Sequence, residues 1–148
     1  MPTFSKLNYH LVFSTKNRRA LIEPAWADRL YGYIGGIIAQ ERGVLLAAGG
    51  MPDHIHLLVG FRPDGTLSDL LREIKSHSSA WVHNQFTKDF AWQEGYSAFT
   101  VSYSLLESVK YYIKHQEEHH CSRSFMEELL RMLKLNEVDY DERYVFVS

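Results

Sequence analysis

Two histidines separated by one residue are the feature of this sequence with the clearest chemical potential. His54 and His56 flank Ile55 in the run DHIHLLV, whose alternation predicts a strand. Side chains at positions i and i+2 of a strand point to the same face, so both imidazoles can converge on one metal ion. Hydrogen-bonded or merely exposed histidines would give the same pattern. The pair is therefore a candidate metal site and needs a second feature to support it.

A tyrosine and an amide at helical spacing provide that second feature. Tyr112 and Gln116 stand four residues apart in VKYYIKHQ, which places them on one face of a predicted helix. Periodicity alone favours an ordinary packing face with Tyr112 as a core aromatic. His115, His119 and His120 follow in the same stretch and are competing ligand candidates. Spacing alone therefore does not decide between a packing face and a functional site, or which of these residues would be a ligand.

The elements that must position these residues follow from hydrophobic periodicity and turn signals. In order, the sequence predicts a strand over 7–14, a helix over 24–42, strands over 44–48 and 53–61 joined by the turn GGMP, a helix from 66 to about 86, and a strand over 96–103. Ser104 with Glu107 and Ser124 with Glu127 resemble capping boxes that begin two further helices, the first reaching about residue 120. The fold class is therefore α+β, a ferredoxin-like βαββαβ sandwich with additional C-terminal helices.

Length and composition limit the function classes. The chain has 148 residues, 45% hydrophobic and 23% charged, with a net charge of −2, which predicts a single domain over 1–148. One cysteine, Cys121, cannot form an intramolecular disulfide. The N-terminus lacks signal-peptide features and no apolar run approaches the ~20 residues of a membrane helix. We expect a cytoplasmic, nucleoid-associated protein with no membrane partner.

The charge is unevenly distributed along the chain. Residues 1–116 carry 12 Lys and Arg against 10 Asp and Glu, whereas residues 117–148 carry 4 against 8. A mildly basic body is thus masked by an acidic tail. Short basic clusters of this kind are most often solvated surface, and nucleic-acid contact is the alternative.

Taken together, the motifs resemble a known family. The chain is similar to the HUH single-tyrosine transposases of the insertion-sequence 200/605 type and their relatives, the REP-associated tyrosine transposases. The resemblance is carried, in order, by YHLVFSTKNRR, MPDHIHLLV, LLREIKS, VSYS, YIKHQ and YDERY. Each segment alone is modest evidence, but the order and spacing of the segments over nearly the whole chain are specific to this family.

The resemblance implies a function and a site. His54 and His56 would be metal ligands with Gln116 as the third, and Tyr112 the nucleophile. Tyr111 is turned by about 100° from Tyr112 around the predicted helix, so helix geometry favours a packing role for it. The implied activity is cleavage and rejoining of single-stranded DNA at hairpin-marked element ends, through a 5′-phosphotyrosine and with Mg²⁺ or Mn²⁺. The family also implies a homodimer, exchange of the tyrosine helix between subunits in at least one state, and no nucleotide cofactor. Candidates for contact with the DNA backbone are Lys16, Arg18, Arg19, Lys75, Lys110 and Lys114.

Other functions fit parts of the sequence. A domesticated nickase acting on palindromic repeats, or a relaxase-like nickase, would cleave DNA by the same chemistry but have a different cellular role. A ferredoxin-like module could bind single-stranded nucleic acid without catalysis, stacking bases on Tyr9, Phe13 or Phe99. A structural or small-molecule regulatory domain of this fold would show no affinity for DNA.

Overall fold

A four-stranded antiparallel sheet forms the centre of the structure, a computed structural model that describes residues 1–120 and 123–145, of residues 119 and 120 the backbone only. The strands are β1 (Leu7–Ser14), β2 (Val44–Met51), β3 (His54–Phe61) and β4 (Ser97–Thr100), in the order β2-β3-β1-β4. Helix α1 (Pro24–Gln40) follows β1 and helix α2 (Leu67–Gln85) follows β3. This connectivity is the ferredoxin-like βαββαβ arrangement, so the predicted fold class is confirmed.

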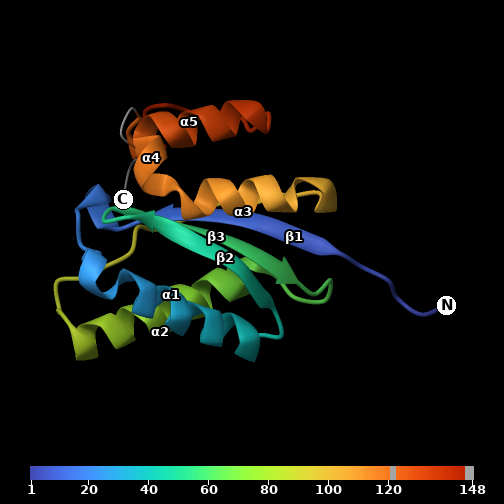
Figure 1. Cartoon of the computed structure of the whole chain (residues 1–148), viewed down its shortest axis with the longest axis horizontal. Coiled ribbons are helices and arrows are strands. Elements are labelled where there is room, and N and C mark those ends of the chain that lie inside the picture. Colours follow the sequence, from blue (N-terminus) through green and yellow to red (C-terminus); the bar gives the residue numbers. More distant parts are fainter. Residues whose placement is uncertain (121–122, 146–148) are drawn as a thin grey trace.

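One face of the sheet packs on α1 and α2 and is dry (Figure 1). Leu11 and Phe13 of β1, with Ile55, Leu57 and Val59 of β3, are fully buried there. Because successive strand residues point to opposite faces, the residues between them must face the other way. The alternation seen in the sequence therefore assigns both histidines of β3 to the opposite face, as predicted.

The C-terminal helices cover that second face. They are α3 (Leu106–Lys114), α4 (Gln116–His120) and α5 (Phe125–Leu135), preceded by a short 3₁₀ turn over Tyr103–Leu105. Figure 1 shows them on the side of the sheet opposite α1 and α2. Two small apolar clusters anchor them: Val12 and Phe99 pack against α5, and Leu58 packs against α3. The site lies on the covered face between these clusters.

A glycine allows α3 to approach the sheet closely. A side chain at Gly49 would overlap the backbone carbonyl of Ile113 in α3. Gly49 and Gly50 belong to β2 and pair with His56 and Ile55, so the prediction that they form a turn is wrong. Both glycines allow neighbouring backbone to come close. The turn between β2 and β3 lies after them, at Pro52 and Asp53.

Three further boundaries differ from the predictions. The fourth strand ends at Thr100, short of the predicted 103. Ser104 lies in the 3₁₀ turn, and α3 begins without a side-chain cap. The helix predicted to reach about residue 120 is interrupted at His115, where φ −113° and ψ 38° leave the helical region. This break separates α3 from α4 and reorients the chain at Gln116.

Two predicted caps are confirmed. Thr66 accepts a hydrogen bond from the backbone N–H of Asp69 at 3.2 Å, and Ser124 accepts one from Glu127 at 3.2 Å. The second cap fixes the start of α5 and hence the residues that α5 presents to the sheet. Cys121 lies outside the described residues. Across residues 1–120 and 123–145, none of the helices is long and apolar enough to cross a membrane.

Candidate metal and nucleophile site

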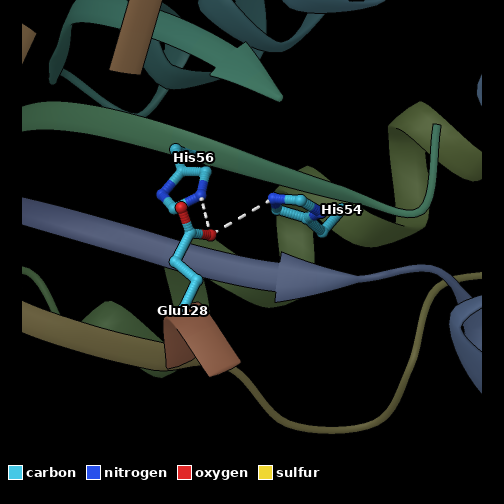
Figure 2. A group of neighbouring side chains, drawn as sticks. All are labelled: His54, His56 and Glu128. Atoms are coloured by element: carbon cyan, nitrogen blue, oxygen red, sulfur yellow. Dashed lines mark hydrogen bonds and ion pairs between the residues drawn. The ribbon is translucent and has the colours of Figure 1, made fainter. Parts of the chain in front are cut away.

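His54 and His56 project from the central strand β3 and share a carboxylate. Both rings are fully buried. The Nε2 atom of His56 lies 2.9 Å from Oε1 of Glu128, and Nε2 of His54 lies 3.4 Å from the same oxygen. Figure 2 shows the carboxylate of Glu128 reaching from α5 to both rings. The two imidazoles do converge, and they converge on a third group that the sequence analysis did not select.

The remaining ring nitrogens are each held by a partner. Nδ1 of His54 lies 2.7 Å from Oδ1 of Asp53, and Nδ1 of His56 lies 2.8 Å from Nε2 of His10 on β1. Burial, with the charge of His56 acting the same way, lowers the pKa of His10 to about 3 against the opposing effect of Glu128. A neutral His10 can accept the Nδ1 proton of His56 and so leave Nε2 of His56 available as a ligand.

Glu128 is a buried anion stabilised by hydrogen bonds. Its burial acts to raise the pKa, but hydrogen bonds from His54, His56 and Tyr112 outweigh burial and hold the pKa far below its ordinary range. Burial likewise acts to lower the pKa of His54, and its bonds to Asp53 and Glu128 raise it overall. The site is therefore negatively charged at its centre, with nitrogen donors around it.

Tyr112 and Gln116 join the same cluster from α3 and α4. The Tyr112 hydroxyl donates a hydrogen bond to Oε2 of Glu128. Oε1 of Gln116 lies 3.3 Å from Nε2 of His54, while its amide nitrogen donates to the backbone carbonyl of Tyr112 at 3.1 Å. One chain thus brings together the four side chains expected to form the site.

The phenol of Tyr112 is kept protonated by its surroundings. Burial and the hydrogen bond to Glu128 raise its pKa well above the ordinary value, and Gln116 and Arg123 oppose this to a smaller extent. The hydrogen bond to Glu128 orients the phenol oxygen, but a carboxylate whose pKa is held so low is a weak proton acceptor.

The donor set fits a divalent cation. One ligand atom from each of His54, His56 and Glu128 lies within 4.8 Å of the other two, which is close enough for a common ion. Gln116 adds an amide oxygen next to His54. Imidazole nitrogen with carboxylate and amide oxygen suits ions from Mn²⁺ to Zn²⁺, so the ligands do not select one metal.

Tyr111 and His115 lie apart from this cluster. Tyr111 is 57% exposed and its ring stacks on His115 at 3.8 Å between centroids. Tyr111 thus packs on His115 at the surface and not in the core, because a step of about 100° around the helix turns it away from Tyr112. The side chains of His119 and His120 lie outside the described residues.

The six basic candidates are distributed over several elements. Lys16, Arg18 and Arg19 lie at or beside the 3₁₀ turn after β1, and Lys110 and Lys114 lie on α3. Lys110 pairs with Glu107 at 3.3 Å. Lys75 of α2 donates to the backbone carbonyls of Gln93, at 3.0 Å, and Gly95. Burial lowers the pKa of Lys75 to about 8. Lys75 therefore holds the loop before β4 and is poorly placed to bind a phosphate.

Two residues of the site were missed by sequence reasoning. Glu128 is an acidic residue on the buried stripe of α5 that Phe125, Leu129 and Leu133 define. His10 is a polar residue on the site face of β1, between two positions of the dry face. A charged or polar residue on an apolar stripe is the pattern that could have identified both.

Two of the three aromatic residues predicted to stack bases in a non-catalytic nucleic-acid module are covered. Phe13 is fully buried in the dry core, and Phe99 is only 6% exposed in the cluster beneath α5. Tyr9 is only partly buried and packs against the dry core. Stacking needs an accessible aromatic face, so Phe13 and Phe99 cannot serve as predicted.

Comparison with known proteins identifies the class of protein. Residues 3–116 match the family described as "Transposase IS200 like", and the chain belongs to that family. It is 31% identical over 119 residues to the IS200 transposase of Salmonella typhimurium, covering 74% of this chain and 76% of that one. It is 26% identical over 120 residues to the ISDra2 transposase TnpA of Deinococcus radiodurans, covering 76% and 86%. The family match ends at Gln116, so Glu128 lies beyond it.

Solved structures agree on the fold. A crystal structure from Deinococcus radiodurans, described as a transposase, superposes with a TM-score of 0.65 at 28% identity, over 76% of this chain and 92% of that one. A REP-associated tyrosine transposase bound to a REP hairpin gives 0.57 at 19% identity, over 76% and 68%. At that identity the second likeness supports the fold alone.

Proposed function

We propose that this member of the family cleaves and rejoins single strands of DNA through a covalent 5′-phosphate linkage to Tyr112. One observation carries the proposal: the Tyr112 hydroxyl and the two imidazoles all bind the carboxylate of Glu128, so the nucleophile and the candidate metal site occupy one place. A phosphodiester is a substrate that needs both an oxygen nucleophile and charge neutralisation.

The proposed cleavage step balances in protons and in bonds. Glu128 orients the Tyr112 hydroxyl by accepting its hydrogen bond, and the phenol proton passes to solvent water as the Tyr112 oxygen attacks phosphorus. The bond between Tyr112 Oη and phosphorus forms, the bond from phosphorus to the 3′-oxygen breaks, and the 3′-oxygen takes up one proton. Because one phosphodiester replaces another, attack by a different 3′-hydroxyl reverses the step and joins strands without a nucleotide cofactor.

The proposed ion is divalent, Mg²⁺ or Mn²⁺ as the family resemblance implies, in a donor set that does not itself select one metal. His54, His56 and Glu128 would hold it, with Gln116 next to them. When bound, the ion would neutralise charge on the phosphate oxygens and on the departing 3′-oxygen. Asp53 and His10 would keep both imidazoles oriented toward it.

The proposed substrate is a single strand with a hairpin next to the cut. A relative of the same fold is described as bound to a REP hairpin. Lys16, Arg18 and Arg19 beside β1, and Lys110 and Lys114 on α3, are the proposed backbone contacts. Such contacts add affinity and make binding dependent on salt.

Covalent trapping tests the proposal. Purified protein is incubated with single-stranded oligonucleotides covering both flanks of its gene, and the covalent adduct is mapped by mass spectrometry. We expect the adduct on Tyr112, its loss in Tyr112→Phe and in EDTA, and recovery with Mn²⁺. The matched variant Tyr111→Phe should keep the adduct. An adduct on Tyr111, or nicking that persists in EDTA, would contradict the proposal.

We also propose a homodimer, because two element ends must be held while strands are exchanged. The site is complete within one chain in this structure, so exchange of the tyrosine helix would require α3 and α4 to leave their own sheet. Mixing Tyr112→Phe with His56→Ala subunits should restore part of the activity in heterodimers. If subunits exchange and the mixture stays inactive, the site works only within one chain.

A further inference from the structure

A hollow of about 400 Å³ lies at the end of the sheet remote from the metal and nucleophile cluster. Its floor is Gly60 of β3, which pairs with Asn8 of β1 on one side and with Val44 of β2 on the other. Paired residues of neighbouring strands share a face, and Gly60 shares its face with His56 of the same strand. At ~3.3 Å per residue, the Cα atoms of Gly60 and His56 are ~13 Å apart. The hollow is therefore a separate place on the face that carries the candidate site.

Asn8 brings an unsatisfied hydrogen-bond donor to this hollow. The residue is only 4% exposed, and its Nδ2 has no hydrogen-bond partner in the part of the chain that the structure describes. The other amide atom, Oδ1, lies 3.4 Å from the point that a Cβ atom on Gly60 would occupy. Half a turn of the amide exchanges the two atoms and would direct the N–H donors over Gly60. Because a buried donor without a partner is costly, an acceptor bound over Gly60 would stabilise it.

The side chains around the hollow are cationic. Lys6, Arg42 and Arg62 line it, and its described lining includes no Asp or Glu. Arg62 donates from Nε to the backbone carbonyl of Glu41 at 3.1 Å and from Nη1 to Asp64 at 3.2 Å. Nη2 of Arg42 lies 3.8 Å from the same Asp64, which offsets one of the three positive charges. The hollow therefore favours an anion.

Arg42 stands at a backbone position that ordinarily favours glycine. It follows the end of α1 with φ 64°, in the left-handed region, and its N–H bonds to the carbonyl of Ala39 at 3.0 Å. Helices commonly end on Gly or Asn in this conformation, because a Cβ atom is strained there. A long cationic side chain at such a position indicates that the side chain itself is used.

We propose that this hollow binds a phosphate group. Phosphate oxygens accept hydrogen bonds from amide and guanidinium donors alike, and those to guanidinium are strengthened by charge. A backbone phosphate of a bound DNA strand and the phosphate of a free nucleotide present the same chemistry. The shared face favours the strand, since ~13 Å is about four nucleotides of a stacked strand at ~3.4 Å each. The strand as source rests on the function proposed above, and a free nucleotide does not.

Phosphate titrations of matched variants test the site. Gly60→Ala adds a methyl group to the floor at an ordinary contact distance of 3.4 Å from Asn8. Arg42→Gly removes a charge and relieves the left-handed backbone, so it should not lower the melting temperature. Both should weaken binding of dAMP and of inorganic phosphate about tenfold. Arg72→Ala is the control, because Arg72 is equally exposed, 68% against 69%, and also pairs with one aspartate. Calorimetry in EDTA measures the affinities.

A strand probe distinguishes the two sources of phosphate. Tyr112→Phe protein in EDTA binds flank oligonucleotides in which a neutral methylphosphonate replaces one phosphate at a time. One position should weaken binding about tenfold, and the same replacement should cost little once Gly60→Ala is added. If dAMP binding depends on Gly60 and Arg42 but no strand position does, the phosphate belongs to a free nucleotide. If neither variant changes the affinity for any probe, the hollow is not a phosphate site.

Asn8→Leu separates a ligand contact from a role in the fold. Leucine removes the unpaired donor, so the melting temperature in phosphate-free buffer should not fall, while phosphate affinity should fall about tenfold. A lower melting temperature with unchanged affinity would show that the amide serves the fold and would overturn the assignment. These titrations need neither metal nor cleavage. Absence of the Tyr112 adduct would therefore refute the proposed function and leave the phosphate titrations to decide this site separately.

Discussion

The two faces of the sheet are made by the same strands and have opposite contents. On the α1 and α2 side, Leu11 and Leu57 lie in a continuous apolar core. On the α3 and α5 side, the neighbouring positions are His10, His56 and Val12, and small apolar clusters flank the polar group. The first face contributes stability through burial, and the second uses burial to strengthen charge interactions. Substitutions on the first face should therefore reduce folding stability, and substitutions on the second should reduce activity.

The largest contrast is expected between adjacent residues of β3. His56→Ala should reduce adduct formation by about 10³-fold or more, because charge neutralisation at the phosphate is worth several kcal/mol. Leu57→Ala should instead lower the free energy of unfolding by about 2–5 kcal/mol, as for other buried leucines. Adduct assays below the melting temperature and urea titrations measure the two effects. Equal loss of stability in both variants would remove the contrast.

The next effect concerns the spacing between α3 and the sheet. Gly49→Ala forces a methyl group against the carbonyl of Ile113, so α3 must shift and carry Tyr112 with it. A displacement of about 1 Å can cost about 10²-fold in rate. Gly36→Ala, in helix α1 with open space around the added methyl, is the matched control and should keep full activity. The adduct rate of the two variants checks this, and an active Gly49→Ala would contradict it.

Glu128 should matter more to metal binding than its neighbour on α5. Glu128→Gln keeps the shape but removes the charge that both imidazoles share, and should weaken Mn²⁺ binding by about 10–100-fold. Glu127→Gln removes the same charge from the exposed cap, where Gln also serves in a capping box. Calorimetric titration with Mn²⁺ distinguishes them. Equal affinities would show that Glu128 is not a ligand.

The smallest effect is expected from His10, which acts through His56. His10→Asn should lower Mn²⁺ affinity about tenfold, since outer partners of ligands contribute about 10–100-fold and an amide restores part of the hydrogen bond. His10→Phe should lose more Mn²⁺ affinity than His10→Asn, because phenylalanine restores no hydrogen bond. Metal titration of both variants measures the difference, and identical affinities would mean that His10 only fills space.

Part of this arrangement could be predicted from local pattern. Strand alternation assigned His54 and His56 to one face and Leu57 to the other, because the side-chain period of a strand is fixed by its backbone. Helical spacing predicted that Tyr112 and Gln116 share one helix face, but the helix breaks at His115 between them, and the two residues reach the site from α3 and α4. The βαββαβ order and two of the helix caps were also predictable, since each depends on residues close in sequence.

The rest depended on residues distant in sequence. Helical periodicity could not show the break at His115, and turn propensity misplaced Gly49, whose role depends on a carbonyl 64 positions further along the chain. The single domain over 1–148, the dimer and the individual DNA contacts stay predictions.

By itself, then, the sequence determined which residues share a face, because that is set by local backbone geometry. Only the tertiary structure decided which faces meet. It brought Glu128 from α5 and His10 from β1 to the two histidines, and it turned Tyr111 to solvent while Tyr112 reached the carboxylate. The physical reason is that packing between elements, which closes gaps of 46 to 72 residues here, depends on the shape of the whole core.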